Sequence, residues 1–106
     1  MADLLKNKRF LIELEHHIRL KNNEAIHKVI PPISTERMLS LSSAVAKLRA
    51  QYIQAAFKFA DTENSKGVIG TEDIEEIASC RTQFEEIRDA FIAISRAIEL
   101  GYISIE

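Results

Sequence analysis

The sequence contains few of the residues that build many-turned folds or disulfide-stapled scaffolds. Its 106 residues include three glycines, two prolines, one cysteine and no tryptophan. So few glycines and prolines favour long helices over a β fold with many turns. A single cysteine excludes an internal disulfide, which is consistent with a reducing, cytoplasmic compartment. The length predicts one domain over residues 1–106, with a core of modest size.

Long apolar runs and clusters of one charge are also missing. No run approaches the roughly 18 apolar residues of a membrane-spanning helix. Charged side chains are scattered through residues 1–20, so we expect no secretory signal. Lysines and arginines alternate with acids and form no basic motif interleaved with aromatics. We therefore expect neither a membrane nor a nucleic acid as partner.

The net charge of −2 conceals an uneven distribution. Residues 1–60 hold ten Lys/Arg and five Asp/Glu, a balance of +5, whereas residues 61–106 hold four and eleven, a balance of −7. We interpret this asymmetry as basic and acidic regions that pack against each other, or as charge that keeps like molecules apart.

The clearest pattern runs over residues 71–100, where apolar residues recur in alternating steps of three and four. That spacing places them in a narrow stripe, or seam, on one side of a helix. Thr71 is a suitable N-cap and Gly101 a suitable left-handed residue after the helix. The seam residues are Ile77, Cys80, Phe84, Ile87, Phe91, Ile94 and Ile98.

The same stepping predicts a second long helix over 34–60, with Ser34 as its N-cap. Its seam residues are Met38, Leu41, Val45, Leu48, Tyr52, Ala55 and Phe59. A further helix is predicted over 3–22, with Leu4, Leu11, Leu14 and Ile18 on one stripe and Leu5 and Phe10 beside it. Asn22-Asn23 would end that helix, a short helix over 24–30 would follow, and Pro31-Pro32 would stop it.

These elements predict an all-α fold, an antiparallel bundle of three long helices plus one short helix. The polar stretch 61–70 would connect the second and third long helices. Residues 101–106 would form an extended tail, with Tyr102 and Ile103 packed on the end of the bundle.

A repeat at an offset of 34 residues gives a second interpretation. Ile53-x-x-Ala56-Phe57 followed by Gly67-x-Ile69-x-x-Glu72 matches Ile87-x-x-Ala90-Phe91 followed by Gly101-x-Ile103-x-x-Glu106. Here the sequence resembles the calmodulin-like EF-hand family. The resemblance implies calcium-ligand positions at Asp61, Glu63, Ser65 and Glu72, and a target helix as the partner. Gly67 stands at position 7 of the loop counted from Asp61, whereas an EF-hand has its glycine at position 6.

Other candidate chemistry rests on single residues or pairs. Glu13-x-x-His16 and Glu24-x-x-His27 have the spacing used in di-iron carboxylate bundles, but also the spacing of ordinary surface pairs on a helix. His17 is interpreted as a solvent-facing residue rather than a phosphoacceptor, and Cys80 as a small apolar residue of the seam. We therefore expect no catalytic residue, no cofactor and no metal site.

Two hypotheses for the function remain. The first is a non-enzymatic interaction or oligomerisation module, a homodimer or small adaptor, whose spare apolar surface at Leu39, Ile53, Phe57 and Ile92 is covered by a second copy or a protein partner. The second is a degenerate EF-hand protein that binds a target helix with weak or no calcium binding. The first predicts a continuous helix over 71–100, and the second predicts a break near Ser95.

Overall fold

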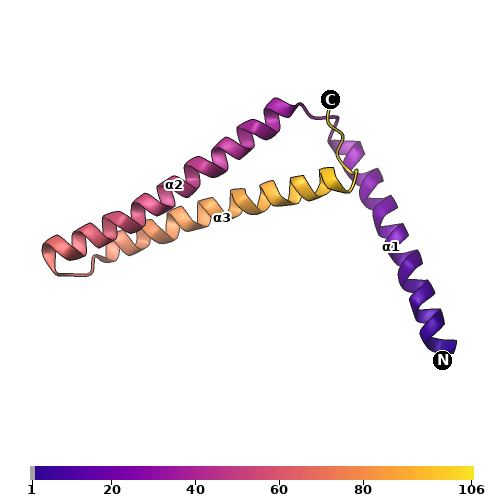
Figure 1. Cartoon of the computed structure of the whole chain (residues 1–106), viewed down its shortest axis with the longest axis horizontal. Coiled ribbons are helices and arrows are strands. Elements are labelled where there is room, and N and C mark those ends of the chain that lie inside the picture. Colours follow the sequence, from indigo (N-terminus) through magenta and orange to yellow (C-terminus); the bar gives the residue numbers. More distant parts are fainter. Residues whose placement is uncertain (1) are drawn as a thin grey trace. The chain divides into compact units, whose positions relative to one another are not determined.

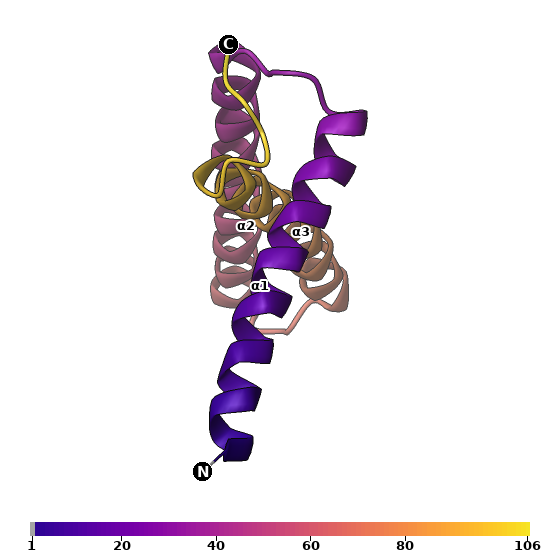
Figure 2. The same ribbon diagram turned by 90° about the vertical axis from the view of Figure 1, so that its right-hand side faces the viewer.

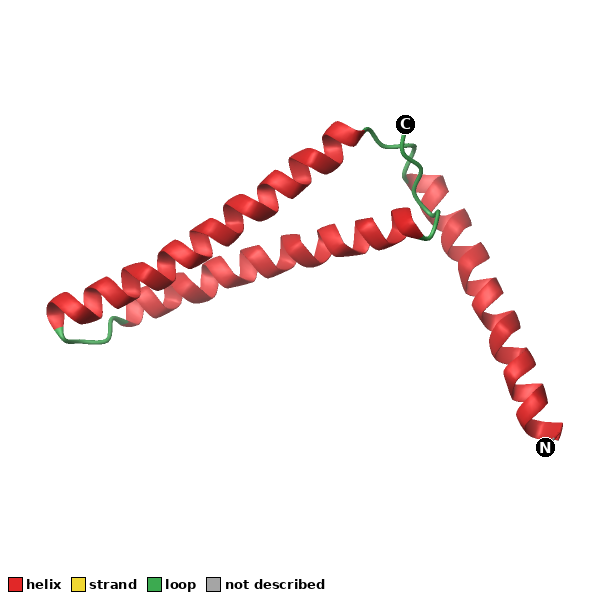
Figure 3. Ribbon diagram, viewed as in Figure 1, coloured by secondary structure: helices red, strands yellow, loops and turns green. Residues whose placement is uncertain are grey.

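The computed structural model describes residues 2–106, which form three α-helices. These are α1 (Ala2–Val29), α2 (Thr35–Lys66) and α3 (Thr71–Glu99) (Figure 1, Figure 3). The prediction of an all-helical chain is confirmed, but the predicted additional short helix is wrong. The structure divides into two compact units, one containing α1 with Arg96–Glu106 and the other containing Thr35–Ser95. Among the described residues, no helix combines the length and apolar character needed to cross a membrane.

Helix α1 runs without interruption through Asn22-Asn23, where the sequence predicted a break between helices 3–22 and 24–30. Among residues 2–106, only glycines have a positive φ, so neither asparagine adopts the left-handed conformation that would end the helix. Asparagine in a helix costs less than about 1 kcal/mol, which a long helix tolerates. The chain leaves the helical path only at the two prolines, just after the amide of Ile30 donates a hydrogen bond of 2.8 Å to the carbonyl of Ile26.

Helix α2 is longer than the predicted 34–60 and continues through polar residues expected in the connection. Hydroxyl groups there bond within the helix: Thr62 Oγ1 donates to the carbonyl of Lys58 (3.0 Å), and Ser65 Oγ donates to that of Asp61 (2.8 Å). The helix ends at Gly67, whose φ of 66° is the left-handed conformation that glycine adopts without strain. Glycine, rather than polar composition, therefore marks the boundary.

Residues 67–70 connect α2 to α3, and both views show this connection joining neighbouring ends of the two helices (Figure 1, Figure 2). So short a connection makes α2 and α3 an antiparallel hairpin. The carbonyl of Gly70 accepts the first hydrogen bond of α3, from the amide of Ile74 at 3.2 Å. Gly70 thus occupies the N-cap position that the sequence predicted for Thr71.

The end of α3 agrees with the predicted glycine termination. Gly101 has a φ of 80°, and the amide of Tyr102 donates to the carbonyl of Ala97 at 2.8 Å, while that of Gly101 donates to Ile98 at 3.0 Å. This pair of bonds is the Schellman motif. It turns the chain so that Tyr102 and Ile103 are buried, within the unit that contains α1.

The tail pairs with the segment that follows α1. Ile33 and Ile105 form a parallel β-bridge, in which the amide of Ile33 donates to the carbonyl of Ser104 and the amide of Glu106 donates to that of Ile33, both at 2.9 Å. Ile33, Tyr102 and Ile103 are buried and form the core of this unit. Residues far apart in the sequence are thereby fixed to each other by backbone hydrogen bonds.

The hairpin has its core along the two predicted seams. Every seam residue between Met38 and Ile94 is buried or half-buried, so the prediction of both seams is confirmed. Phe84 is 8 % exposed, and its ring stacks on that of Tyr52 with 6.0 Å between ring centroids. Ala55, on the α2 seam, is 3 % exposed. Most other seam residues remain half-exposed, as expected when only two helices share a core.

Candidate functional site

The two flanks of the hairpin seam differ in chemistry. Residues that directly follow a seam residue lie on one flank, and residues that directly precede one lie on the other. We call the first flank the apolar face. Its large side chains are all between 47 % and 67 % exposed, and alanines stand between them. Its residues that directly follow a seam residue are Leu39, Ala46, Ile53, Ala56 and Ala60 on α2 and Ala78 and Ile92 on α3. Phe57, at the outer edge of the groove, and Ile74, in the first turn of α3, extend the face.

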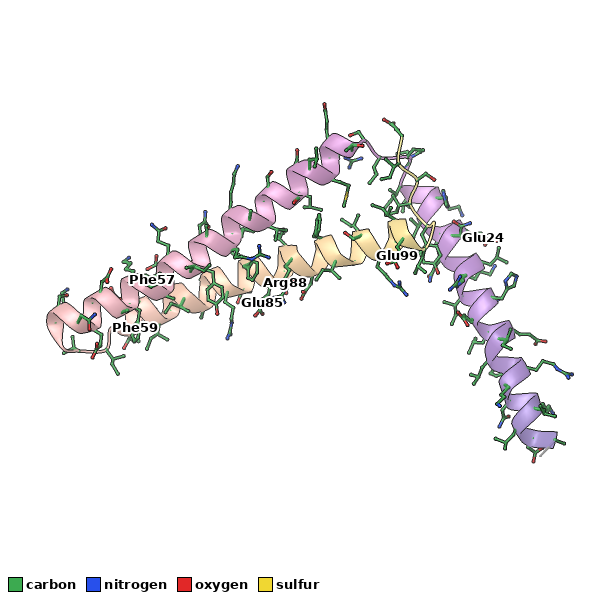
Figure 4. The ribbon with its side chains drawn as sticks, viewed as in Figure 1. Glu24, Phe57, Phe59, Glu85, Arg88 and Glu99 are labelled. Atoms are coloured by element: carbon green, nitrogen blue, oxygen red, sulfur yellow. The ribbon has the colours of Figure 1, made fainter. Side chains whose placement is uncertain are left out.

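A shallow groove of about 320 Å³ lies on the apolar face near the Gly67–Gly70 end of the hairpin. Phe57, which projects from α2, forms part of its wall (Figure 4). Four of the lining residues belong to α2 beyond the seam, and Ile77 contributes the wall from α3. The lining residues are Tyr52, Ile53, Ala56, Phe57, Ala60 and Ile77. The groove therefore presents apolar and small side chains and the ring of Tyr52, and its lining includes no acidic or basic residue.

The opposite flank is polar. Lys58 Nζ donates a hydrogen bond of 3.0 Å to Glu76 Oε2, which joins α2 to α3. This hydrogen bond, together with the negative charge of Glu76, raises the pKa of Lys58 above its ordinary 10.5. Around the pair lies a depression of about 620 Å³ that is also lined by Gln51, Gln54, Asp61 and Phe57, so Phe57 borders both flanks. Both flanks thus follow the same two helices but offer different surfaces.

Three arginines bring positive charge to the middle of the apolar face. Arg49 and Arg88 each place the guanidinium carbon 5.2 Å from the centre of the Phe84 ring. Arg81 follows a seam residue and therefore lies on the same flank. Cation–π contacts of this kind hold the arginine stems across the seam while the charged groups reach solvent. Arg88 forms an ion pair with the adjacent Asp89, with 3.1 Å between Nε and Oδ1. Glu85, which projects from α3, is a further acid on this flank (Figure 4).

Helix α1 has an apolar stripe and no buried residue. Its exposed fractions run from 38 % at Leu14 to 68 % at Ile12. The sequence pattern predicted that these side chains lie in a bundle core. Within the unit that contains α1, no other described segment buries them. We call this surface the α1 stripe; Leu4, Leu11, Leu14 and Ile18 form its line, and the exposed Leu5, Phe10 and Ile12 lie beside that line.

All four residues predicted as an interaction surface are exposed: Leu39 (62 %), Ile53 (49 %), Phe57 (67 %) and Ile92 (56 %). The hairpin brings them to one flank, although they come from two helices. Their role as a binding surface stays a prediction. Sequence reasoning missed Ile74 and the interleaved alanines, which share the flank. Including the residue that directly follows each seam residue in the predicted surface would have identified the alanines, but not Ile74.

The calcium alternative receives no geometric support. Asp61, Glu63 and Ser65 lie on the regular helix α2, and Glu72 lies in the first turn of α3. Helix α3 continues through Ser95, where the EF-hand interpretation required a break. Within residues 2–106, no group of three or more histidine, cysteine or acidic side chains is arranged to hold a metal ion. Cys80 is half-buried at the seam, and His16 and His17 are exposed on α1.

Comparison with protein-family models, curated proteins and solved structures gave no match to this chain. The function is therefore argued from the chain's own surfaces.

Proposed function

We propose that this chain is a non-enzymatic helical module that associates with a second copy of itself, most simply as a homodimer that completes an antiparallel helical bundle. The proposal rests on the number of large apolar side chains that are exposed to solvent and aligned along the helices. The apolar face and the α1 stripe together hold twelve large apolar side chains, each at least 38 % exposed. They are arranged in stripes, whereas ordinary surface apolar residues are scattered singly.

The exposed area is of the size that a stable interface needs. Complete burial of one aliphatic side chain removes about 60 to 120 Å² from water. Allowing about 50 Å² for each half-exposed side chain, the twelve would bury roughly 600 Å² per copy. A standard interface buries about 800 Å² on each partner, so these side chains with their polar neighbours would form most of one.

Self-association explains the surface more simply than an unrelated partner does. A two-fold axis uses each patch twice, and symmetric dimers are the commonest soluble assemblies. We propose that the module acts in the cytoplasm as an oligomerising or adaptor piece, with protein as its only partner. Calcium binding forms no part of the proposal.

Native mass measured by light scattering over a concentration series tests this proposal. The wild-type chain is expected to approach twice its 12.0 kDa mass as the concentration rises. Ile53→Glu places a carboxylate in the groove and is expected to shift the chain to the monomer, because burying an unpaired charge is costly. Gln54→Glu adds the same charge to the polar flank and is expected to leave the dimer intact. A wild-type monomer at every concentration would contradict the proposal.

A further inference from the structure

We propose that the α1 stripe of one copy docks on the apolar face of the α2–α3 hairpin of a second copy. The inference rests on the proposed self-association and adds which surfaces meet. Each chain would supply one docking helix and one receiving face. A pair of chains related by a two-fold axis would then make two identical contacts and close without further growth.

The apolar face has the form that receives a helix. Ile53 and Phe57 stand on either side of Ala56, and the groove beside them runs along α2 towards Ala60. Small residues between large ones let a third helix approach to the separation of about 8 to 10 Å found in packed helices. The α1 stripe supplies the matching shape, since Leu4, Leu11 and Ile18 recur every seven residues along one line.

The arginines on the apolar face distinguish this arrangement from one in which two hairpins meet face to face. Face-to-face pairing about the middle of the hairpin would bring Arg49, Arg81 and Arg88 against the same residues of the partner. Like charges at an interface are strongly unfavourable. The α1 stripe is instead flanked by Glu15 and Arg19, which follow Leu14 and Ile18 and pair with each other at 3.4 Å. The arginines of the apolar face would then meet an edge of mixed charge rather than three like charges.

The overall charges of the two partners also agree with this arrangement. Helix α1 carries six Lys/Arg and four Asp/Glu, a balance of +2, whereas the α2–α3 hairpin carries eight and eleven, a balance of −3. Two copies of α1 would repel each other, but α1 and the hairpin of another copy attract over the distances at which proteins first meet. The charge asymmetry along the chain would thereby favour the association of two copies.

Complementary variants test the docking directly. Leu11→Asp damages the α1 stripe and leaves the apolar face intact, whereas Ile53→Asp does the reverse. Each variant alone is expected to dimerise about 100-fold more weakly than wild type. An equal mixture of the two is expected to form heterodimers, because the intact α1 of Ile53→Asp docks on the intact apolar face of Leu11→Asp. Both sites are at least 49 % exposed, and circular dichroism of each variant verifies that it folds.

The control mixture combines Leu11→Asp with Ile18→Asp, both in the α1 stripe, and is expected to show no rescue. Light scattering of all samples separates the outcomes. If Leu11→Asp dimerises like wild type, or if the complementary mixture stays monomeric while wild type dimerises, the docking is wrong and self-association stands. If wild type is monomeric, both proposals fail. A monomeric wild type that binds phosphatidylserine vesicles through α1 would assign the stripe to a lipid surface and overturn the inference.

Discussion

The seam of the hairpin and its apolar face are both built from apolar side chains but have different surroundings. Ala55 is 3 % exposed, whereas the adjacent Ala56 is open to solvent. Phe84 is 8 % exposed and stacked, whereas Phe57 is 67 % exposed. Hydrophobicity alone therefore does not distinguish the residues that hold the hairpin together from those available to a partner. The position relative to the seam does, and two pairs of substitutions and one single substitution exploit that difference.

The largest expected difference is between two phenylalanines changed in the same way. Phe84→Ala removes a buried ring that stacks on Tyr52 and contacts two arginines, so it should lower the free energy of unfolding by about 3 to 5 kcal/mol. Phe57→Ala removes a mostly exposed ring and should change that free energy little in the monomer. Urea denaturation at low protein concentration measures both. Equal losses for the two variants would contradict the assignment of Phe57 to a docking surface.

A smaller difference is expected between neighbouring alanines. Ala55→Leu adds bulk where α2 and α3 meet and should destabilise the hairpin by about 1 to 3 kcal/mol through overpacking. Ala56→Leu adds the same bulk to the groove and should leave the monomer's thermal unfolding unchanged while weakening the dimer. Calorimetry and light scattering on both variants test this prediction. An undisturbed dimer in Ala56→Leu would show that the groove is not part of the interface.

The smallest effect is expected on the polar flank. Because Glu76 raises the pKa of Lys58, their pair stabilises the hairpin fully below the ordinary lysine pKa of 10.5 and loses that contribution as the pH rises through the raised value. Glu76→Gln should therefore lower Tm slightly at neutral pH. The two curves of Tm against pH should converge in strong alkali. The dimerisation constant should not change. Loss of the dimer in Glu76→Gln would show that the interface lies on the polar flank instead of the apolar face.

Much of the hairpin could be predicted from the sequence because its signals are local. Alternating steps of three and four located both seams, and Gly101 located the end of α3. Two boundaries were wrong for a common reason. Asn22-Asn23 and residues 61–66 have weak helix propensity, but neighbouring helical turns carried the backbone through both, and only proline and glycine stopped it.

What covers an apolar stripe could not be predicted in the same way. Periodicity shows which side of a helix is apolar, but the partner of that side lies elsewhere in the sequence or in another molecule. The seams of α2 and α3 pack against each other because the short connection between the two helices holds them side by side. Leu4, Leu11 and Leu14 have the same spacing but no such constraint, so the sequence placed them in a core although they are exposed.

Cross-linking in a mixture of isotope-labelled and unlabelled chains shows whether α1 of one copy lies against the hairpin of another. A carbodiimide joins lysine amines to nearby carboxylates without a spacer, and mass spectrometry shows whether the joined peptides come from one chain or two. Docking of α1 on a second copy predicts links of mixed isotope composition between α1 and the α2–α3 hairpin. Mixed links confined to pairs of α1, or links only within single chains, would contradict it.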